Sequence, residues 1–162
     1  MNANTNTSAF TVVSVDDEPV VHRMLARLIA DSGLPVVHAG AARSGAEALE
    51  LIPRLRPDIC LLDIQMDEMD GLELASRLAD VLDYTPRVIY LTAYGSFEYA
   101  QKAVKLGAAD YILKPINRTE LISTLRDLTN HLQAQRLDQI ERDRLKDRVR
   151  SILPSVAADT TA

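Results

Sequence analysis

The stretch "LLDIQMDEMDG", residues 61–71, passes from an apolar run into three aspartates within a few positions. Leu61 and Leu62 belong to the run "DICLLD" (58–63), which is short, aliphatic and typical of a buried strand. Asp63 ends this run, and a buried carboxylate is costly unless a cation or hydrogen bonds compensate for it. The first question that the sequence raises is therefore what compensates Asp63.

Four further short apolar runs occur on either side of this one. They are "FTVVSV" (10–15), "PVVHA" (35–39), "RVIYLT" (87–92) and "DYILK" (110–114). Segments with apolar residues at helical spacing alternate with the runs. This alternation predicts an α/β fold, in which a doubly wound, five-stranded parallel sheet is followed by an extended C-terminal helix. Ligands of such sheets bind at the carboxyl ends of the strands.

Several residues predict where the helices begin and end. Ser44 and Glu47 have the spacing of a capping box, so a helix should begin after Ser44. Pro53 is expected to end or kink that helix, because proline lacks a backbone N–H. Gly107 is expected to end the fourth helix, and Asp70 to stand at a turn where the third helix begins.

The composition is that of an ordinary globular protein. The chain has 162 residues, is 47% hydrophobic and carries a net charge of −5, which gives no electrostatic reason to expect nucleic-acid binding. It contains no apolar stretch of about eighteen residues, so no membrane span is expected. The single cysteine, Cys60, excludes an internal disulfide and is expected to be an inert core residue. These features favour a cytoplasmic protein.

Polar side chains follow four of the five runs, at the points where the predicted strands end. They are Asp16, Asp17, Glu18, Asp63, Thr92 and Lys114. Because the carboxyl ends of parallel strands meet at one edge of the sheet, we expect these groups to lie close together. Clustered carboxylates must bind a cation or raise their pKa values. Oxygen ligands with room for water suit Mg²⁺.

This set of groups is suited to phosphoryl transfer. Asp63 beside a metal ion and Lys114 is a plausible nucleophile toward phosphorus, which would give an acyl phosphate. Each residue also has a simpler interpretation. Asp17 and Glu18 could be first-turn acids of a helix, Thr92 an ordinary strand end, and Lys114 a solvated side chain. Only their joint arrangement favours phosphoryl chemistry.

With these residues in place, the chain resembles the receiver domain of two-component response regulators from about Phe10 to Leu132. The resemblance is carried by "VDDE", "LLDIQMDEMDG", "LTAY" and "YILKP", each following a predicted strand in the expected order. It implies a bacterial, chemotaxis-regulator-like domain with the flavodoxin-like strand order 2-1-3-4-5. It also implies a phosphoprotein that catalyses only its own Mg²⁺-dependent phosphorylation and dephosphorylation and is not an enzyme toward other substrates.

The resemblance assigns roles to the acidic residues. It implies that Asp63 accepts a phosphoryl group from a histidine kinase or a histidine phosphotransfer protein. It further implies that Asp17 and Asp63 bind Mg²⁺ directly, that Mn²⁺ can substitute, and that Asp16 acts through a water molecule. The backbone carbonyl of Gln65 would complete the protein ligands.

The resemblance also implies a switch. Thr92 and Tyr111 match the family's switch pair, in which the hydroxyl turns toward the phosphoryl group and the aromatic ring follows inward. Lys114 matches the family's lysine, and the Lys114–Pro115 peptide bond is expected to be cis. The small Ala93 would keep the phosphorylation pocket open.

The chain departs from the family pattern at Asp67, where many receivers have proline, and the effect is expected on loop rigidity and phosphorylation kinetics, not on the assignment of the phosphotransfer residues. Gln65 and Tyr94 occupy positions that often tune dephosphorylation in the family. The first-helix residue His22 is expected to be a surface histidine, and His38 and His131 suggest no role.

Four segments are predicted along the chain: a disordered tail (1–9), a receiver domain (10–132), a helical linker with coiled-coil features (133–153) and a second disordered tail (154–162). A homodimer through the C-terminal helix, or through the face of the fourth helix, fifth strand and fifth helix, is expected, and a solvated single helix is the alternative. The apolar positions change heptad register along the helix, from Leu132, Leu137 and Ile140 to Leu145, Val149 and Ile152.

Three functions compete. The leading one is a phosphorylation-dependent switch that controls an output domain or partner. A phosphatase of the haloacid-dehalogenase type normally needs an aspartate two residues after its nucleophile, and Gln65 at that position argues against it. A phosphorylation-independent interaction domain is disfavoured because the whole set of site residues is present. Whether an output domain follows is left open.

Overall fold

The computed structural model describes residues 8–93, 97–105 and 107–152 and divides the chain into two compact units, Met1–Arg126 and Asp127–Ala162. In the described residues, five strands alternate with five helices. The strands are β1 (Phe10–Val15), β2 (Val36–Ala42), β3 (Ile59–Asp63), β4 (Arg87–Thr92) and β5 (Asp110–Leu113). The helices are α1 (Pro19–Asp31), α2 (Gly45–Leu55), α3 (Gly71–Val81), α4 (Phe97–Lys105) and α5 (Arg118–Ile152).

The strands form one parallel sheet in the order β2-β1-β3-β4-β5. The predicted fold class and strand order are therefore confirmed. β1 lies beside β3, so the residues that follow these two strands emerge next to each other. In the pairing of β3 with β4, Asp63 lies opposite Leu91, and in the pairing of β4 with β5, Thr92 lies opposite Leu113.

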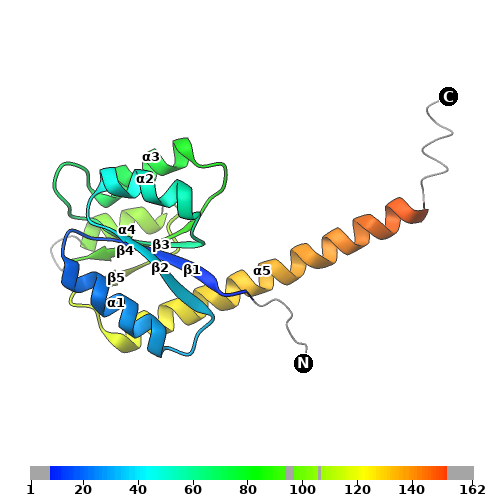
Figure 1. Cartoon of the computed structure of the whole chain (residues 1–162), viewed down its shortest axis with the longest axis horizontal. Coiled ribbons are helices and arrows are strands. Elements are labelled where there is room, and N and C mark those ends of the chain that lie inside the picture. The colour runs from blue at the N-terminus through cyan, green and yellow to red at the C-terminus, as the bar shows by residue number, and fades with distance from the viewer. Residues whose placement is uncertain (1–7, 94–96, 106, 153–162) are drawn as a thin grey trace. The chain divides into compact units, whose positions relative to one another are not determined.

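Helices cover both faces of the sheet (Figure 1). One face packs against α2, α3 and α4 through a core that contains Val13, Leu62, Ile52 and Leu74. On the other face lie α1 and the first turns of α5, which contribute buried residues such as Leu25. β3 is buried along its whole length, as expected for a central strand of a sheet covered on both sides. Cys60 lies in this strand, and burial raises the pKa of its thiol to about 12, so the prediction of an inert cysteine is confirmed.

The second strand is longer than predicted. It was expected over residues 35–39 and extends to Ala42, through the small residues Gly40 and Ala41. The pairing shifts there, since Val12 pairs with His38 and Val13 with Gly40. Glycine and alanine are poor strand formers, so the sequence gives little sign of this part.

Pro53 is predicted to end or kink its helix, and the first of these two expectations is wrong. α2 continues to Leu55 and ends at Arg56, which adopts a left-handed φ of 49°. The N–H of Arg56 donates to the carbonyl of Ile52 at 2.8 Å. Pro53 lacks an N–H and its ring crowds the carbonyl four residues earlier, but the bond from Arg56 to Ile52 still closes the last turn of the helix.

The predicted helix starts are confirmed. The N–H of Glu47 donates to the hydroxyl of Ser44 at 3.1 Å, and Asp70 caps α3 by accepting from the N–H of Glu73 at 2.8 Å. Gly107 follows α4 with a φ of 111°, a conformation that favours glycine.

His22 is buried, so the prediction of a surface histidine is wrong. Its Nδ1 lies 2.7 Å from the hydroxyl of Ser14, and its Nε2 lies 2.8 Å from the carbonyl oxygen of Asp16. The hydroxyl of Ser14 also lies 2.8 Å from Nε2 of His38. His22 shares the inward face of α1 with Leu25 and Ile29, three and seven residues further on. That spacing indicates the buried face of α1, but the spacing alone does not reveal the partners that make burial of a polar side chain possible.

In the second unit, α5 continues to Ile152, and from Leu137 onward every described residue is exposed. Among the described residues, no helix is long and apolar enough to span a membrane. The two tails predicted to be disordered lie outside the described residues, except for Ser8 and Ala9. The division of the chain at residues 132 and 133 stays a prediction.

Gly71 joins α3 to the end of β3 by close backbone contact. Its N–H donates to the carbonyl of Ile64 at 2.9 Å. A Cβ atom at this position would stand 2.4 Å from the carbonyl oxygen of Asp63, which is too close for any side chain. The glycine therefore fixes the backbone on which Asp63 sits.

We expect Gly71→Ala to lower the free energy of unfolding by about 2–3 kcal/mol, because the backbone at Asp63 must move. Urea unfolding followed by circular dichroism measures this. Gly33→Ala is the matched control: Gly33 has a φ of 75° and no neighbouring atom within 4 Å of an added Cβ, so it should cost about 1 kcal/mol. Equal costs for the two variants would contradict the close-contact explanation.

His22→Leu should lower the free energy of unfolding by about 1–3 kcal/mol, because it leaves the Asp16 carbonyl without its partner in a buried position. The same urea unfolding experiment measures this loss. His131→Leu, at an exposed position, is the control and should change stability by less than about 0.5 kcal/mol. A neutral His22→Leu would show that these hydrogen bonds do not stabilise the fold.

Candidate functional site

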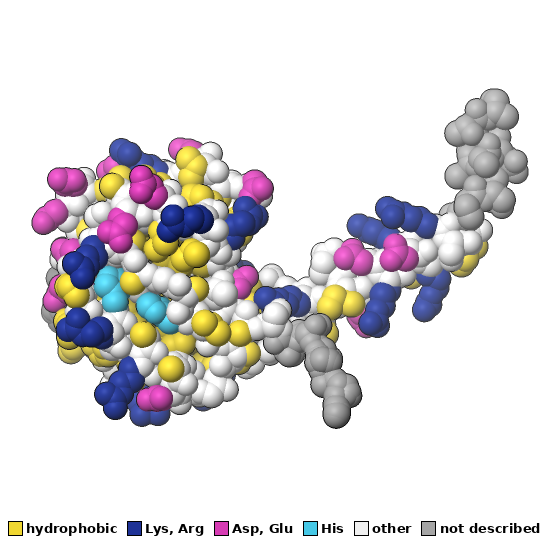
Figure 2. Space-filling model, in the orientation of Figure 1, with side chains coloured by type: hydrophobic (Ala, Val, Ile, Leu, Met, Phe, Trp, Pro, Cys, Tyr) yellow, Lys and Arg dark blue, Asp and Glu magenta, His cyan; other side chains and the backbone are white. Residues whose placement is uncertain are grey.

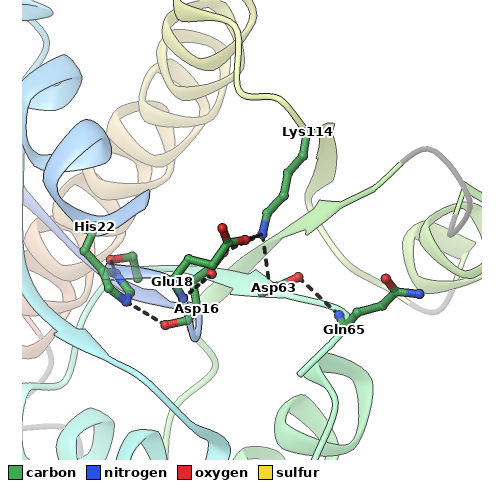
Figure 3. Close-up of polar contacts among 7 residues, drawn as sticks. Asp16, Glu18, His22, Asp63, Gln65 and Lys114 are labelled. Atoms are coloured by element: carbon green, nitrogen blue, oxygen red, sulfur yellow. Dashed lines mark hydrogen bonds and ion pairs between the residues drawn. The ribbon is translucent and has the colours of Figure 1, made fainter. Parts of the chain in front are cut away.

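Lys114 joins two buried carboxylates at the carboxyl edge of the sheet (Figure 3). Its Nζ lies 2.6 Å from Oδ2 of Asp16 and 3.2 Å from Oδ2 of Asp63. A third carboxylate, that of Glu18, lies 3.9 Å away. Asp16 follows β1, Asp63 ends β3 and Lys114 follows β5, so three separated segments converge as the sequence predicts.

Asp63 is buried and only partly compensated. Burial and the negative charge of Asp16 raise the pKa of its carboxyl to about 6. The ammonium of Lys114 and the N–H of Gln65, which donates to Oδ1 at 3.1 Å, act in the opposite direction. A carboxylate whose negative charge is disfavoured in this way gains from a further cation.

Lys114 is held in place by its partners. Burial alone would lower the pKa of its ammonium, but Asp16 and Asp63 outweigh burial and raise the pKa above its usual value. Its backbone N–H donates to the carbonyl of Thr92 at 2.8 Å, which ties it to the end of β4. The Lys114–Pro115 peptide bond is cis, as the resemblance implied.

A group of acidic side chains suited to a metal ion lies beside this ion pair. The carboxylates of Asp16, Asp17 and Glu18 bring oxygen atoms within 4.8 Å of one another. Asp17 and Glu18 are exposed, and Asp16 is buried. The donor atoms are all carboxylate oxygens, and those of the exposed Asp17 and Glu18 leave access for water, which fits Mg²⁺ and equally Mn²⁺.

The sequence placed Glu18 among the polar residues at the strand ends but gave it no part in binding a metal. In the described residues the acidic group contains Glu18, whereas Asp63 is turned toward Lys114 and Gln65. The position of the Lys114 side chain determines which carboxylates lie together, and the spacing of residues in the sequence does not reveal that position. The backbone N–H of Glu18 also donates to Oδ1 of Asp16 at 2.9 Å, which orients that carboxylate.

The two residues of the predicted switch lie on neighbouring strands. Thr92 is fully buried and its hydroxyl donates to the carbonyl of Ala93 at 3.2 Å. Tyr111 is half-buried and packs against the core. Ala93 is exposed, and Tyr94 lies outside the described residues.

The loop between β3 and α3 carries the departure from the family pattern. Asp67 is exposed, and its carbonyl accepts the N–H of Met69 at 2.7 Å. Glu68 follows with a φ of 68°. Nothing in the structure explains a negative charge at residue 67.

Comparison with known proteins connects this site to one family. A family model described as "Response regulator receiver domain" matches residues 12–126. The chain is 35% identical over 147 residues to the uncharacterized transcriptional regulatory protein YesN of Bacillus subtilis, covering 88% of this chain and 39% of that protein. It is 41% identical to the positive alginate biosynthesis regulatory protein of Pseudomonas aeruginosa, covering 71% of this chain and 45% of that protein.

Solved structures show the same likeness. The receiver (REC) domain of AraT, a response regulator from Geobacillus stearothermophilus, has 32% sequence identity and a TM-score of 0.69, covering 79% of this chain and 98% of that chain. The signal receiver domain of the putative response regulator NarL from Mycobacterium tuberculosis has 33% identity and a TM-score of 0.66, covering 76% and 98%. The chain spans less than half the length of the two curated relatives. It belongs to the family of response regulator receiver domains.

Proposed function

We propose that this domain is a phosphorylation-dependent switch, in which Asp63 accepts a phosphoryl group and the resulting change controls an output domain or partner. The observation that carries the proposal is the raised pKa of Asp63 beside Lys114, at the edge where β1, β3 and β5 converge. Family membership supports a histidine kinase or a histidine phosphotransfer protein as the phosphoryl donor. Two relatives are named as regulatory proteins, which supports a regulatory output.

The chemistry follows from the groups present. A carboxylate oxygen of Asp63 attacks phosphorus, the bond from phosphorus to the donor's imidazole nitrogen breaks, and that nitrogen keeps the electron pair. The ammonium of Lys114, 3.2 Å from Oδ2 of Asp63, is placed to neutralise charge on the phosphoryl oxygens. The proposed Mg²⁺ ligands are Asp17, Asp63 and the carbonyl of Gln65, with Asp16 acting through water. When bound, Mg²⁺ would neutralise further charge on the transferred group.

The switch uses Thr92 and Tyr111. In the structure the Thr92 hydroxyl is bonded to the carbonyl of Ala93, so it must exchange this partner to reach a phosphoryl oxygen on Asp63. That movement would leave space for the half-buried ring of Tyr111 to move inward. A phosphoryl group thereby favours one of two arrangements of the same residues.

The first test is phosphorylation with a small phosphodonor. Incubation with acetyl phosphate and Mg²⁺ should add one phosphoryl group to the wild-type chain, measured by intact mass spectrometry. Asp63→Asn should abolish the addition, because the amide is not a nucleophile toward phosphorus. Undiminished labelling of Asp63→Asn would show that another residue is the acceptor.

The same assay tests the metal ligands. EDTA or Asp17→Asn should slow phosphorylation at least about tenfold, because the charge of the transferred group is no longer neutralised. Asp67→Asn is the matched control, since it removes an exposed carboxylate from the neighbouring loop and should leave the metal requirement intact. Equal effects of the Asp17 and Asp67 variants would argue against a specific metal site.

The raised pKa of Asp63 predicts a pH dependence of stability in EDTA. Between about pH 4 and pH 6, the folded chain keeps a proton on Asp63 that the unfolded chain has lost, so the free energy of unfolding falls as pH rises through this window. Asp63→Asn lacks this decrease and should be more stable than the wild type by about 1–3 kcal/mol at pH 7. Urea unfolding at several pH values measures both chains, and parallel pH profiles would contradict the perturbed carboxyl.

A further inference from the structure

A chain of hydrogen bonds leads from the surface of the first unit to the backbone of the candidate site. Ser14, Asp16 and His22 are buried, and His38 in β2 is half-buried. The hydroxyl of Ser14 lies 2.7 Å from Nδ1 of His22 and 2.8 Å from Nε2 of His38. Nε2 of His22 lies 2.8 Å from the carbonyl oxygen of Asp16. Figure 2 shows neighbouring histidine side chains at the surface, in the region where α1 and β2 lie.

The direction of each hydrogen bond follows from the Asp16 carbonyl. A carbonyl oxygen can only accept, so the proton of neutral His22 must be on Nε2. Nδ1 of His22 is then an acceptor, and the hydroxyl of Ser14 must donate to it. The oxygen of Ser14 in turn accepts from Nε2 of His38. Burial and the neighbouring His22 lower the pKa of His38, which favours the neutral form that this arrangement needs.

The bond from His22 holds the peptide group between two proposed metal ligands, since the Asp16 carbonyl belongs to the peptide that links Asp16 to Asp17. The N–H of Asp16 is held separately, because it donates to the carbonyl of Ala42 at 3.1 Å. Oxygen atoms of Asp16, Asp17 and Glu18 lie within 4.8 Å of one another. Rotation of the peptide after Asp16 would move the Asp17 carboxylate away from this arrangement. Figure 3 shows the ring of His22 directed toward Asp16.

We propose that His22 is a positioning residue for the metal site, because its ring holds the Asp16–Asp17 peptide in the orientation that brings the acidic side chains together. Ser14 supports this role by fixing the proton of His22 on Nε2. The role rests on the proposed function, in which Asp17 binds Mg²⁺ and Asp16 acts through water. In other metal sites, loss of a group that orients the ligands typically weakens metal binding by about 10–100-fold.

A purely structural role for His22 is the alternative, and two amide side chains separate the roles. The amide nitrogen of glutamine can take the place of Nε2 of histidine, and the amide oxygen of asparagine can take the place of Nδ1. His22→Gln should therefore keep the bond to the Asp16 carbonyl and lose the bond from Ser14. His22→Asn should keep the bond from Ser14 and lose the bond to Asp16. Each variant loses one buried hydrogen bond, so both should lower the free energy of unfolding by similar amounts.

Binding of Mn²⁺ to the full chain tests the proposal, because the electron paramagnetic resonance signal of free Mn²⁺ falls when the ion binds. His22→Asn should raise the Kd for Mn²⁺ by about tenfold, and His22→Gln should bind at least about threefold more tightly than His22→Asn. Asp17→Asn identifies the binding that belongs to this site, because it removes a proposed ligand. Ile29→Val is the control for stability alone: Ile29 is buried on the same helix, and the variant should keep the wild-type Kd.

The results distinguish this proposal from the proposed function. Equal Kd values for His22→Asn and the wild type overturn the positioning role and leave the proposed function intact. Equal losses of affinity in His22→Asn and His22→Gln also overturn it, because the bond to the Asp16 carbonyl would then make no difference. A wild-type chain that neither binds Mn²⁺ nor accepts a phosphoryl group from acetyl phosphate overturns the proposed function, and the positioning role with it.

Nitrogen-15 NMR of the histidine rings tests the proton positions in the wild-type chain without any metal. At about pH 8, above the ordinary pKa of histidine, both His22 and His38 should carry the proton on Nε2. The exposed His131 is the reference and should show a mixture of its two neutral forms. Ser14→Ala removes the acceptor of the His38 proton, so His38 should then show such a mixture as well. A proton on Nδ1 of His22 overturns the proposal, because the Asp16 carbonyl would then lack its donor.

Discussion

The ion pairs of Lys114 with Asp16 and Asp63 are the contacts on which the candidate site depends. The strand order places β1 beside β3, so the carboxylates that follow these two strands are forced together at one edge of the sheet. Lys114 follows β5 and lowers the cost of this arrangement, because its ammonium neutralises part of the negative charge. The compensation is incomplete, because burial and Asp16 still raise the pKa of Asp63 to about 6. A bound metal ion would relieve the remaining excess of negative charge, so the same electrostatics accounts for both the cost of the site and its proposed affinity for a cation.

Most of the sheet was predictable, because each strand is a short aliphatic run and strands buried on both faces need such residues. The exceptions have physical causes. The end of β2 consists of Gly40, Ala41 and Ala42, which pair in the sheet although their own strand preference is weak. α2 passes through Pro53 because the bond from Arg56 to Ile52 closes its last turn. His22 is buried because Ser14 and the carbonyl of Asp16 satisfy both of its ring nitrogens, and sequence periodicity does not reveal such partners.

The site was predictable at the level of the sheet edge but not at the level of side-chain geometry. Parallel strands bring their ends together whatever side chains they carry, so the convergence of Asp16, Asp63 and Lys114 followed from topology. The direction of the Lys114 side chain determines which carboxylates belong to the acidic group suited to a metal ion. With Nζ of Lys114 at 2.6 Å from Asp16 and 3.2 Å from Asp63, the acidic group in the described residues contains Glu18 instead of Asp63. A cation bound at this edge would compete with Lys114 for the oxygens of Asp16 and Asp63, so the ligand set would depend on the balance between two positive charges.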